Sequence, residues 1–164
     1  MSKKKAMFFK QTIAEQVGTE LWIIADASAI ATEANAIVTS GNYYWDGGGN
    51  TITSDATEFT DGLYSVKVVG TGNLFYMYFD AFDGDLAVGT DLVVSFSYKV
   101  LGGTTTFYGF SRTTPSWASE NFSATTWTEK SYAVQVTSTS YKRMYLDVPN
   151  GVTIWIDKVS ILKL

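Results

Sequence analysis

Apolar and polar residues alternate along most of the chain after residue 18. In the stretch DLVVSFSYKV every second position is apolar: Leu92, Val94, Phe96, Tyr98 and Val100. A period of two is typical of a β-strand that turns one face toward a core. Runs of this kind, bounded by Gly-rich or Asp-Gly turns, predict strands over residues 21–24, 43–45, 51–54, 63–69, 74–80, 91–100, 105–112, 126–136, 140–148 and 152–162.

These strands follow one another without the strand–helix–strand order that parallel sheets need. Residues 25–42 are small and irregular and are expected to be mostly loop. A chain of 164 residues is long enough for one domain with a sizeable core. The pattern therefore predicts an all-β fold, an antiparallel β-sandwich or jelly roll.

The last strand changes phase. In GVTIWIDKVSILKL, residues Ile154 and Ile156 are one step out of register with Val159 and Ile161. A β-bulge produces this shift, because two residues of one strand then face one residue of its neighbour. We expect a bulge at Asp157 and Lys158 that keeps all four apolar side chains in one core.

Residues 1–18 differ from the rest and form a predicted N-terminal arm, followed by one jelly-roll domain over residues 19–164. Phe9, Ile13 and Val17 have the spacing of one helix face, which predicts a short amphipathic helix that ends at Gly18. The arm is a candidate docking segment, and the alternative is a frayed terminus. Its candidate docking residues are Lys3, Lys4, Lys5, Phe8, Phe9, Ile13 and Val17.

Charge divides the chain in the same place. The first ten residues hold four of the 12 basic residues and none of the 16 acidic ones, which leaves 8 basic and 16 acidic residues in the remainder. An acidic body is unsuited to gripping nucleic acid. No apolar run is long enough to cross a membrane, and no signal peptide is apparent, so we expect a complete cytoplasmic translation product.

The composition also restricts the chemistry. The chain has no cysteine and no histidine, which excludes the usual zinc sites, thiolate chemistry and histidine-based triads. Acidic residues occur in turns, but no spacing singles out a catalytic pair of carboxylates. We therefore expect a protein that is not an enzyme.

Four segments, in order, resemble carbohydrate-binding modules with the galactose-binding-like β-jelly roll. They are GLYSVKVVG (62–70), VGTDLVVSFSYKVLGG (88–103), ATTWTEKSYAVQV (124–136) and IWIDKVSIL (154–162). The resemblance covers about residues 19–164. It implies that Asp157 helps to bind a structural calcium ion, as the first acid of an acidic pair in the last strand. Lys158 replaces the second acid, so a purely structural bulge residue is the alternative.

Strand alternation also selects candidate binding residues. It places Tyr108, Phe110 and Arg112 on one face, and it points alternate residues of 74–80 and 140–148 outward. The resulting set of glycan-binding candidates is Tyr76, Tyr78, Tyr108, Arg112, Arg143 and Tyr145. Sugar rings stack on aromatic planes, and their hydroxyl groups bond to charged and amide groups. The alternatives for this face are a cover over the core and a subunit interface.

The loop of residues 113–122 supplies a further candidate, Trp117. An exposed loop tryptophan is a good anchor for a sugar or a protein, whereas an indole that folds back is a lid on the sandwich.

Two functions follow from these features. The first is a phage virion protein, a decoration or fibre subunit that docks on other virion subunits through its arm, forms a homo-oligomer and binds host or environmental polysaccharide. The alternative is a glycan-binding module of a secreted polysaccharide-degrading enzyme.

Overall fold

The computed structural model describes residues 19–24, 37–38, 43–46, 49–60, 65–78, 87–114, 119–138 and 143–164. For residues 19–24, 37–38, 43–46 and 77–78 it describes the backbone alone. The predicted arm, residues 1–18, and Trp117 lie outside the described residues. No described helix is long and apolar enough to cross a membrane.

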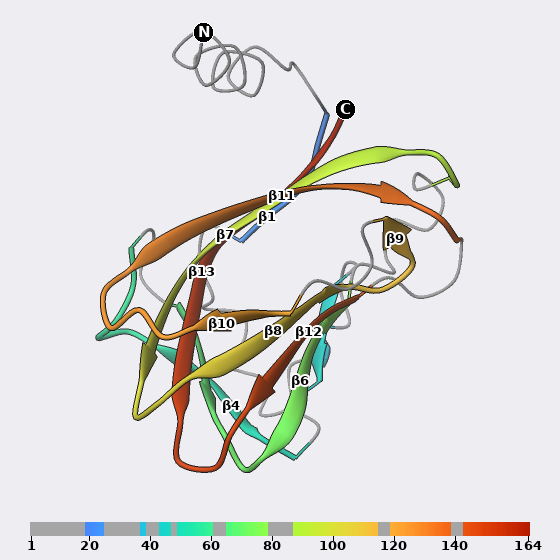
Figure 1. Ribbon diagram of the computed structural model, residues 1–164. Coiled ribbons are helices and arrows are strands. Elements are labelled where there is room, and N and C mark those ends of the chain that lie inside the picture. The colour runs from blue at the N-terminus through green and yellow to red at the C-terminus, as the bar shows by residue number, and fades with distance from the viewer. Residues whose placement is uncertain are drawn as a thin grey trace, which may run out of the picture.

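The described strands form two antiparallel sheets, as expected (Figure 1). Sheet A has the order β4 (Thr51–Asp55), β5 (Ser65–Val69), β13 (Thr153–Lys163), β7 (Asp91–Leu101), β11 (Thr128–Val136) and β9 (Thr113–Thr114), and β1 (Thr19–Ile24) pairs with β13. Sheet B has the order β10 (Glu120–Phe122), β8 (Thr105–Phe110), β12 (Arg143–Val148), β6 (Asn73–Tyr78), β3 (Tyr43–Asp46) and β2 (Ile37–Val38). The chain is thus an all-β sandwich.

The core lies between the sheets and follows the predicted alternation. Leu92, Val94, Phe96, Tyr98 and Val100 of β7 are all buried. Phe75, Met144, Leu146 and Val148 are buried from the side of sheet B. Stacked rings of Tyr98 and Phe122 connect the two layers, with ring centres 4.1 Å apart, and Phe122 also stacks on Phe107 of its own sheet at 5.3 Å. The wide aromatic side chains fill the space between the sheets.

The strands β9 and β10 were not expected, because residues 113–122 have the composition of a loop. Each is short and pairs at the edge of a sheet: Gln135 and Val136 of β11 pair with β9, and residues 105–107 of β8 pair with β10. Segments of two or three residues are too short to show a period in the sequence. Only the backbone partners identify them as strands.

The prediction that Tyr108, Phe110 and Arg112 share one face is wrong. Opposite β12, Tyr145 pairs with Gly109 and Leu146 pairs with Phe107, so Tyr108 is an extra residue in β8. This β-bulge reverses the alternation, and Phe110 therefore enters the core. Arg112 comes after the end of β8, in a turn with a φ of 62°.

The bulge in β13 confirms the predicted phase change. Asp157 pairs with Ser97 of β7, and Ser160 pairs with Ser95, so two residues of β13 face one residue of β7. Ile154, Ile156, Val159 and Ile161 are all buried in the core cluster. On its other side, β13 pairs with β5 up to Ile156 and with β1 from Val159. The bulge thus lies where β13 exchanges one neighbour for another.

Asp157 fills the junction between these two neighbours. Its carboxylate is 1% exposed, and its Oδ2 atom accepts hydrogen bonds from the backbone N (2.6 Å) and the Oγ1 (2.8 Å) of Thr60. Its Oδ1 atom accepts the backbone N–H of Lys158 at 2.8 Å. The side chain therefore satisfies donors at a place where strand pairing is interrupted.

We expect Asp157→Ala to lower the free energy of unfolding by about 2–4 kcal/mol, because it leaves buried donors without an acceptor. Asp157→Asn keeps one acceptor oxygen and should cost less. Urea denaturation measures both. Equal stability of wild type and Asp157→Ala would contradict this role.

Two glycines of the turn before β6 are required for different reasons. A Cβ on Gly70 would lie 2.2 Å from the carbonyl oxygen of Pro149 and 2.6 Å from that of Val148. A Cβ on Gly72 would meet no atom within 4 Å, but Gly72 has a φ of 85°. Crowding by neighbouring carbonyl groups therefore excludes a side chain at Gly70, whereas the positive φ disfavours a side chain at Gly72.

Gly70→Ala should therefore destabilise the fold by about 2 kcal/mol or more, since backbone atoms must move apart. Gly72→Ala should cost only about 1–2 kcal/mol, the penalty of a left-handed backbone. Urea denaturation of the two variants provides the comparison, and a larger loss for Gly72→Ala would show that crowding at Gly70 is unimportant.

Candidate functional site

Three neighbouring strands of sheet B bring the tyrosine and arginine candidates together. Tyr145 of β12 lies opposite Tyr76 of β6, Arg143 lies opposite Tyr78, and Asp147 lies opposite Leu74. Paired residues of neighbouring strands point to the same side of a sheet. Alternation from Thr106, which lies opposite Asp147, also places Tyr108 on this side, next to the Gly109 that pairs with Tyr145. We call this outer surface the Tyr76 face; its residues are Leu74, Tyr76, Thr106, Tyr108, Arg143, Tyr145 and Asp147.

The centre of the Tyr76 face is a cluster of three side chains. The Arg143 guanidinium lies 4.8 Å from the ring centre of Tyr76 and 4.6 Å from that of Tyr145. The two rings meet edge to face, with centres 5.2 Å apart and planes inclined by 75°. Arg143 Nε also donates a hydrogen bond to the Tyr145 hydroxyl. Cation–π attraction and this hydrogen bond hold the arginine against both rings.

The three members of this cluster differ in exposure. Tyr145 is only 6% exposed, whereas Tyr76 and Arg143 are half-buried. The backbone of Arg143 is held from β8, because its carbonyl accepts the Ser111 N–H at 2.8 Å and its N–H donates to Ser111 Oγ at 3.2 Å. Tyr145 therefore supports the cluster, and Tyr76 and Arg143 present the surface that a ligand would contact.

The remaining candidates take different positions. Tyr108 is half-buried on the Tyr76 face. Arg112 is exposed in the turn after β8, beside Ser111. The backbone of Tyr78 belongs to β6 next to Arg143, but its side chain is not described. The structure therefore brings Tyr76, Tyr108, Arg143 and Tyr145 together and places Arg112 at the margin.

Asp147 is a member of the face that was not selected as a candidate. It is half-buried and lies opposite Thr106 as well as Leu74. Alternation with Arg143 and Tyr145 already pointed it outward, which is the signal that identifies it. Its carboxylate is a hydrogen-bond acceptor for hydroxyl groups. A further acidic residue, Asp46 of β3, pairs with Tyr76 through its backbone.

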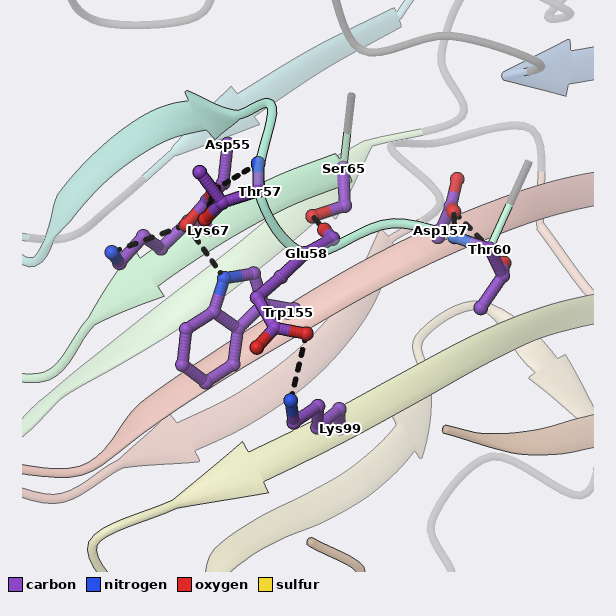
Figure 2. Close-up of polar contacts among 9 residues, drawn as sticks. All are labelled: Asp55, Thr57, Glu58, Thr60, Ser65, Lys67, Lys99, Trp155 and Asp157. Atoms are coloured by element: carbon purple, nitrogen blue, oxygen red, sulfur yellow. Dashed lines mark hydrogen bonds and ion pairs between the residues drawn. The ribbon is translucent and has the colours of Figure 1, made fainter. Parts of the chain in front are cut away.

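The outer face of sheet A carries a different aromatic cluster (Figure 2). Trp155 is 6% exposed and donates its Nε1–H to Asp55 Oδ2 at 3.0 Å. The ammonium groups of Lys67 and Lys99 lie 5.4 and 5.6 Å from its ring centre. Asp55 forms an ion pair with Lys67 (3.2 Å), and Glu58 forms one with Lys99 (2.7 Å). Both lysines are therefore matched by an acid.

This network ties the segment that follows β4 to sheet A. Thr57 donates to Asp55 Oδ1 through its N–H (2.8 Å) and hydroxyl (2.6 Å), and Ser65 Oγ donates to the Glu58 carbonyl. Burial alone raises the pKa of the Asp55 carboxyl, but hydrogen bonds from Thr57, Trp155 and Lys67 outweigh it and hold the pKa well below its usual range. The cluster is structural. The sequence shows no local sign of it, because Asp55 and Trp155 are 100 residues apart.

A third polar cluster joins the edges of the two sheets. Glu120 of β10 accepts hydrogen bonds from Lys130 Nζ and, at 2.9 Å, from the Tyr132 hydroxyl, both on β11. Lys130 lowers the pKa of Glu120, whereas burial and then the Glu120 carboxylate raise the pKa of Tyr132. These contacts close one side of the sandwich.

The described residues around Asp157 show a hydrogen-bonded carboxylate. Both of its oxygens accept N–H or O–H donors. No group of three acidic ligands that could hold a metal ion occurs in the part of the chain that the structure describes. The calcium prediction stays a prediction, since residues 61–64 next to Thr60 lie outside that part.

Comparison with solved structures places this architecture among known folds. The CBM22-1 xylan-binding domain of Xyn10C from Paenibacillus barcinonensis is 16% identical, with a TM-score of 0.61, and the match covers 89% of this chain and 95% of that domain. The CBM22-1–CBM22-2 tandem of the same protein is 14% identical, with a TM-score of 0.64, and the match covers 92% of this chain and 46% of the tandem. TmCBM61, solved with β-1,4-galactotriose, is 13% identical, with a TM-score of 0.53, over 83% of this chain and 96% of that one.

The chain has the jelly-roll fold of carbohydrate-binding modules. The resemblance seen in the four sequence segments is thereby confirmed at the level of the fold. No family model matches the sequence, and no curated protein matches it.

The Asp55 network predicts a dependence of stability on pH. A carboxyl whose pKa is lowered by folding stabilises the protein above its unfolded pKa, about 3.9, and this contribution is lost as the pH falls toward the lower folded pKa. Asp55→Asn should therefore cost about 2 kcal/mol at pH 7, and the difference from wild type should shrink below about pH 4.

Urea denaturation between pH 7 and pH 2 measures this difference. Asp91→Asn, which removes an exposed carboxylate that bonds to Gln135, controls for the change in net charge. A difference that stays constant down to pH 2 would contradict the lowered pKa of Asp55.

Proposed function

We propose that the chain is a non-catalytic polysaccharide-binding module and that the Tyr76 face is its binding surface. The observation that carries the proposal is the cluster of Tyr76, Arg143 and Tyr145 on an outer sheet face. The fold supports it, because solved structures of the same fold include a xylan-binding domain and a module bound to β-1,4-galactotriose.

The face offers the two kinds of contact that a sugar chain uses. The Tyr76 ring provides a partly exposed π surface for the apolar C–H face of a pyranose. Arg143 provides hydrogen-bond donors, and Asp147 provides acceptors for hydroxyl groups. Arg143 and Asp147 are four residues apart on β12, which places them about 14 Å from one another along the strand. The face is therefore suited to several units of an extended chain.

The cluster is also ordered before a ligand arrives. Arg143 is held by the Tyr145 hydroxyl, by two aromatic rings and by the backbone contacts of Ser111. A side chain that is already held loses less rotamer entropy on binding. Tyr145 contributes to affinity in this way, although it is almost fully buried.

The solved structures of this fold that are carbohydrate-binding modules support a role in binding without catalysis. Solved structures of this fold include a CBM22-1 module joined to the GH10 module of a xylanase from Clostridium thermocellum. By analogy, we propose that this chain directs a polysaccharide-degrading enzyme to its substrate outside the cell.

The virion interpretation stays a prediction of the sequence. It depends on residues 1–18, which lie outside the described residues, and no described contact bears on a virion subunit or on a homo-oligomer. Deletion of residues 1–18 followed by an assembly assay remains its test.

We expect Tyr76→Ala to weaken binding to a soluble xylan or β-1,4-galactan about tenfold or more, because it removes the exposed ring at the centre of the face. Isothermal titration and affinity electrophoresis in polysaccharide gels measure the change. Phe59→Ala is the matched control, since Phe59 is an exposed aromatic residue (41%) in the segment tied to sheet A.

Unchanged thermal stability of both variants must accompany the result. If wild type binds no polysaccharide in a broad screen, or if Phe59→Ala weakens binding as much as Tyr76→Ala, the proposal is wrong.

A further inference from the structure

Arg112 has an unusual backbone conformation for an arginine. Its φ of 62° lies in the left-handed region, in the turn that leads from β8 of sheet B to β9 of sheet A. Its carbonyl oxygen accepts the Thr137 N–H at 2.9 Å, which fixes the turn against the end of β11. A left-handed backbone is unfavourable for a residue with a Cβ, and glycine or asparagine would adopt it more readily.

Among the described residues, one other non-glycine residue, Lys158, has a positive φ. The β13 bulge accounts for Lys158, because that position is the site of the register shift. No comparable contact within the described part of the chain accounts for an arginine at residue 112, since the turn is fixed through its backbone and the side chain is exposed. Strained residues of this kind tend to occur at ligand sites, so the position suggests a function for the side chain.

The turn brings the backbone of this second arginine close to that of the first. Ser111 pairs with Arg143 through both its N–H and its Oγ. Arg112 follows Ser111, so its Cα lies about 3.8 Å from that of the residue paired with Arg143. Both arginines have long side chains that form two parallel hydrogen bonds with a carboxylate. Arg112 therefore lies in the turn next to the end of the Tyr76 face that holds Arg143, and Asp147 lies toward the other end.

We infer that the Tyr76 face selects a neutral polysaccharide that carries occasional uronic acid groups, whose carboxylate binds between Arg112 and Arg143. This inference rests on the proposed function and adds the ligand class. A polymer charged at every unit fits less well, because Asp147 would repel it at the far end of the face. The chain also has a net charge of −4, which disfavours a dense polyanion.

The experiment compares glucuronoxylan with the same polymer after chemical reduction of its carboxyl groups to alcohols. Isothermal titration should show that the reduced polymer binds about tenfold more weakly, the loss of one charge-assisted contact. Added NaCl should weaken binding of the native polymer and leave binding of the reduced polymer nearly unchanged. Polygalacturonate should bind more weakly than glucuronoxylan.

Arg112→Gly and Lys158→Gly form a matched pair of variants. Each removes one positive charge and relieves one left-handed backbone, so both should be at least as stable as wild type. Arg112→Gly should lose about tenfold in affinity for glucuronoxylan and should show a smaller difference between native and reduced polymers than wild type, because Arg143 remains. Lys158→Gly should bind like wild type, because Lys158 is exposed at the bulge of sheet A.

The outcomes separate the two proposals. Equal binding of native and reduced glucuronoxylan by wild type, or unchanged affinity of Arg112→Gly, overturns the inference of an acidic ligand and leaves the proposed function standing. Tighter binding of polygalacturonate than of glucuronoxylan also overturns it. Failure to bind any neutral or acidic polysaccharide overturns the proposed function and this inference together.

Discussion

The β-bulge at Asp157 and Lys158 is the constraint on which the sandwich depends. β13 pairs with β7 along most of its length, but on its other side it must accept β5 first and β1 afterwards. If β13 kept a strict period of two without the extra residue, the apolar side chains of its second half would point away from the core. The extra residue restores the apolar face, and the buried Asp157 carboxylate takes up the donors at the gap. One bulge thus joins three neighbouring strands to a continuous core.

A second bulge, in β8, acts on the opposite sheet. It allows Phe107 and Phe110 to enter the core together, while Tyr108 stays on the outer surface with Thr106. Bulges commonly re-aim side chains in this manner near functional sites. The bulge therefore removes Phe110 from the outer side of sheet B and leaves Tyr108 there. The turn that follows, with its left-handed Arg112, carries the chain from sheet B to sheet A.

The two outer faces show how similar residues acquire different roles. Each contains aromatic rings with cationic side chains against them. On sheet A, Lys67 and Lys99 cover Trp155 and are matched by Asp55 and Glu58, so the charges are satisfied internally and the indole is buried. On sheet B, Arg143 lies on two tyrosine rings and bonds to a neutral hydroxyl, and the ring of Tyr76 stays partly exposed. The first arrangement stabilises the fold, and the second is suited to a ligand.

The sequence by itself determined the class of fold, the strands with a clear period of two and the phase change at Asp157, because alternation is a local consequence of strand geometry. It also pointed Tyr76, Arg143 and Tyr145 outward. Tertiary structure alone decided that these three side chains touch, that Tyr145 is buried, that β8 contains a bulge and that Trp155 bonds to Asp55. These features depend on strand pairing and on contacts between residues far apart in the chain, up to 100 positions for Asp55 and Trp155, which no local pattern encodes.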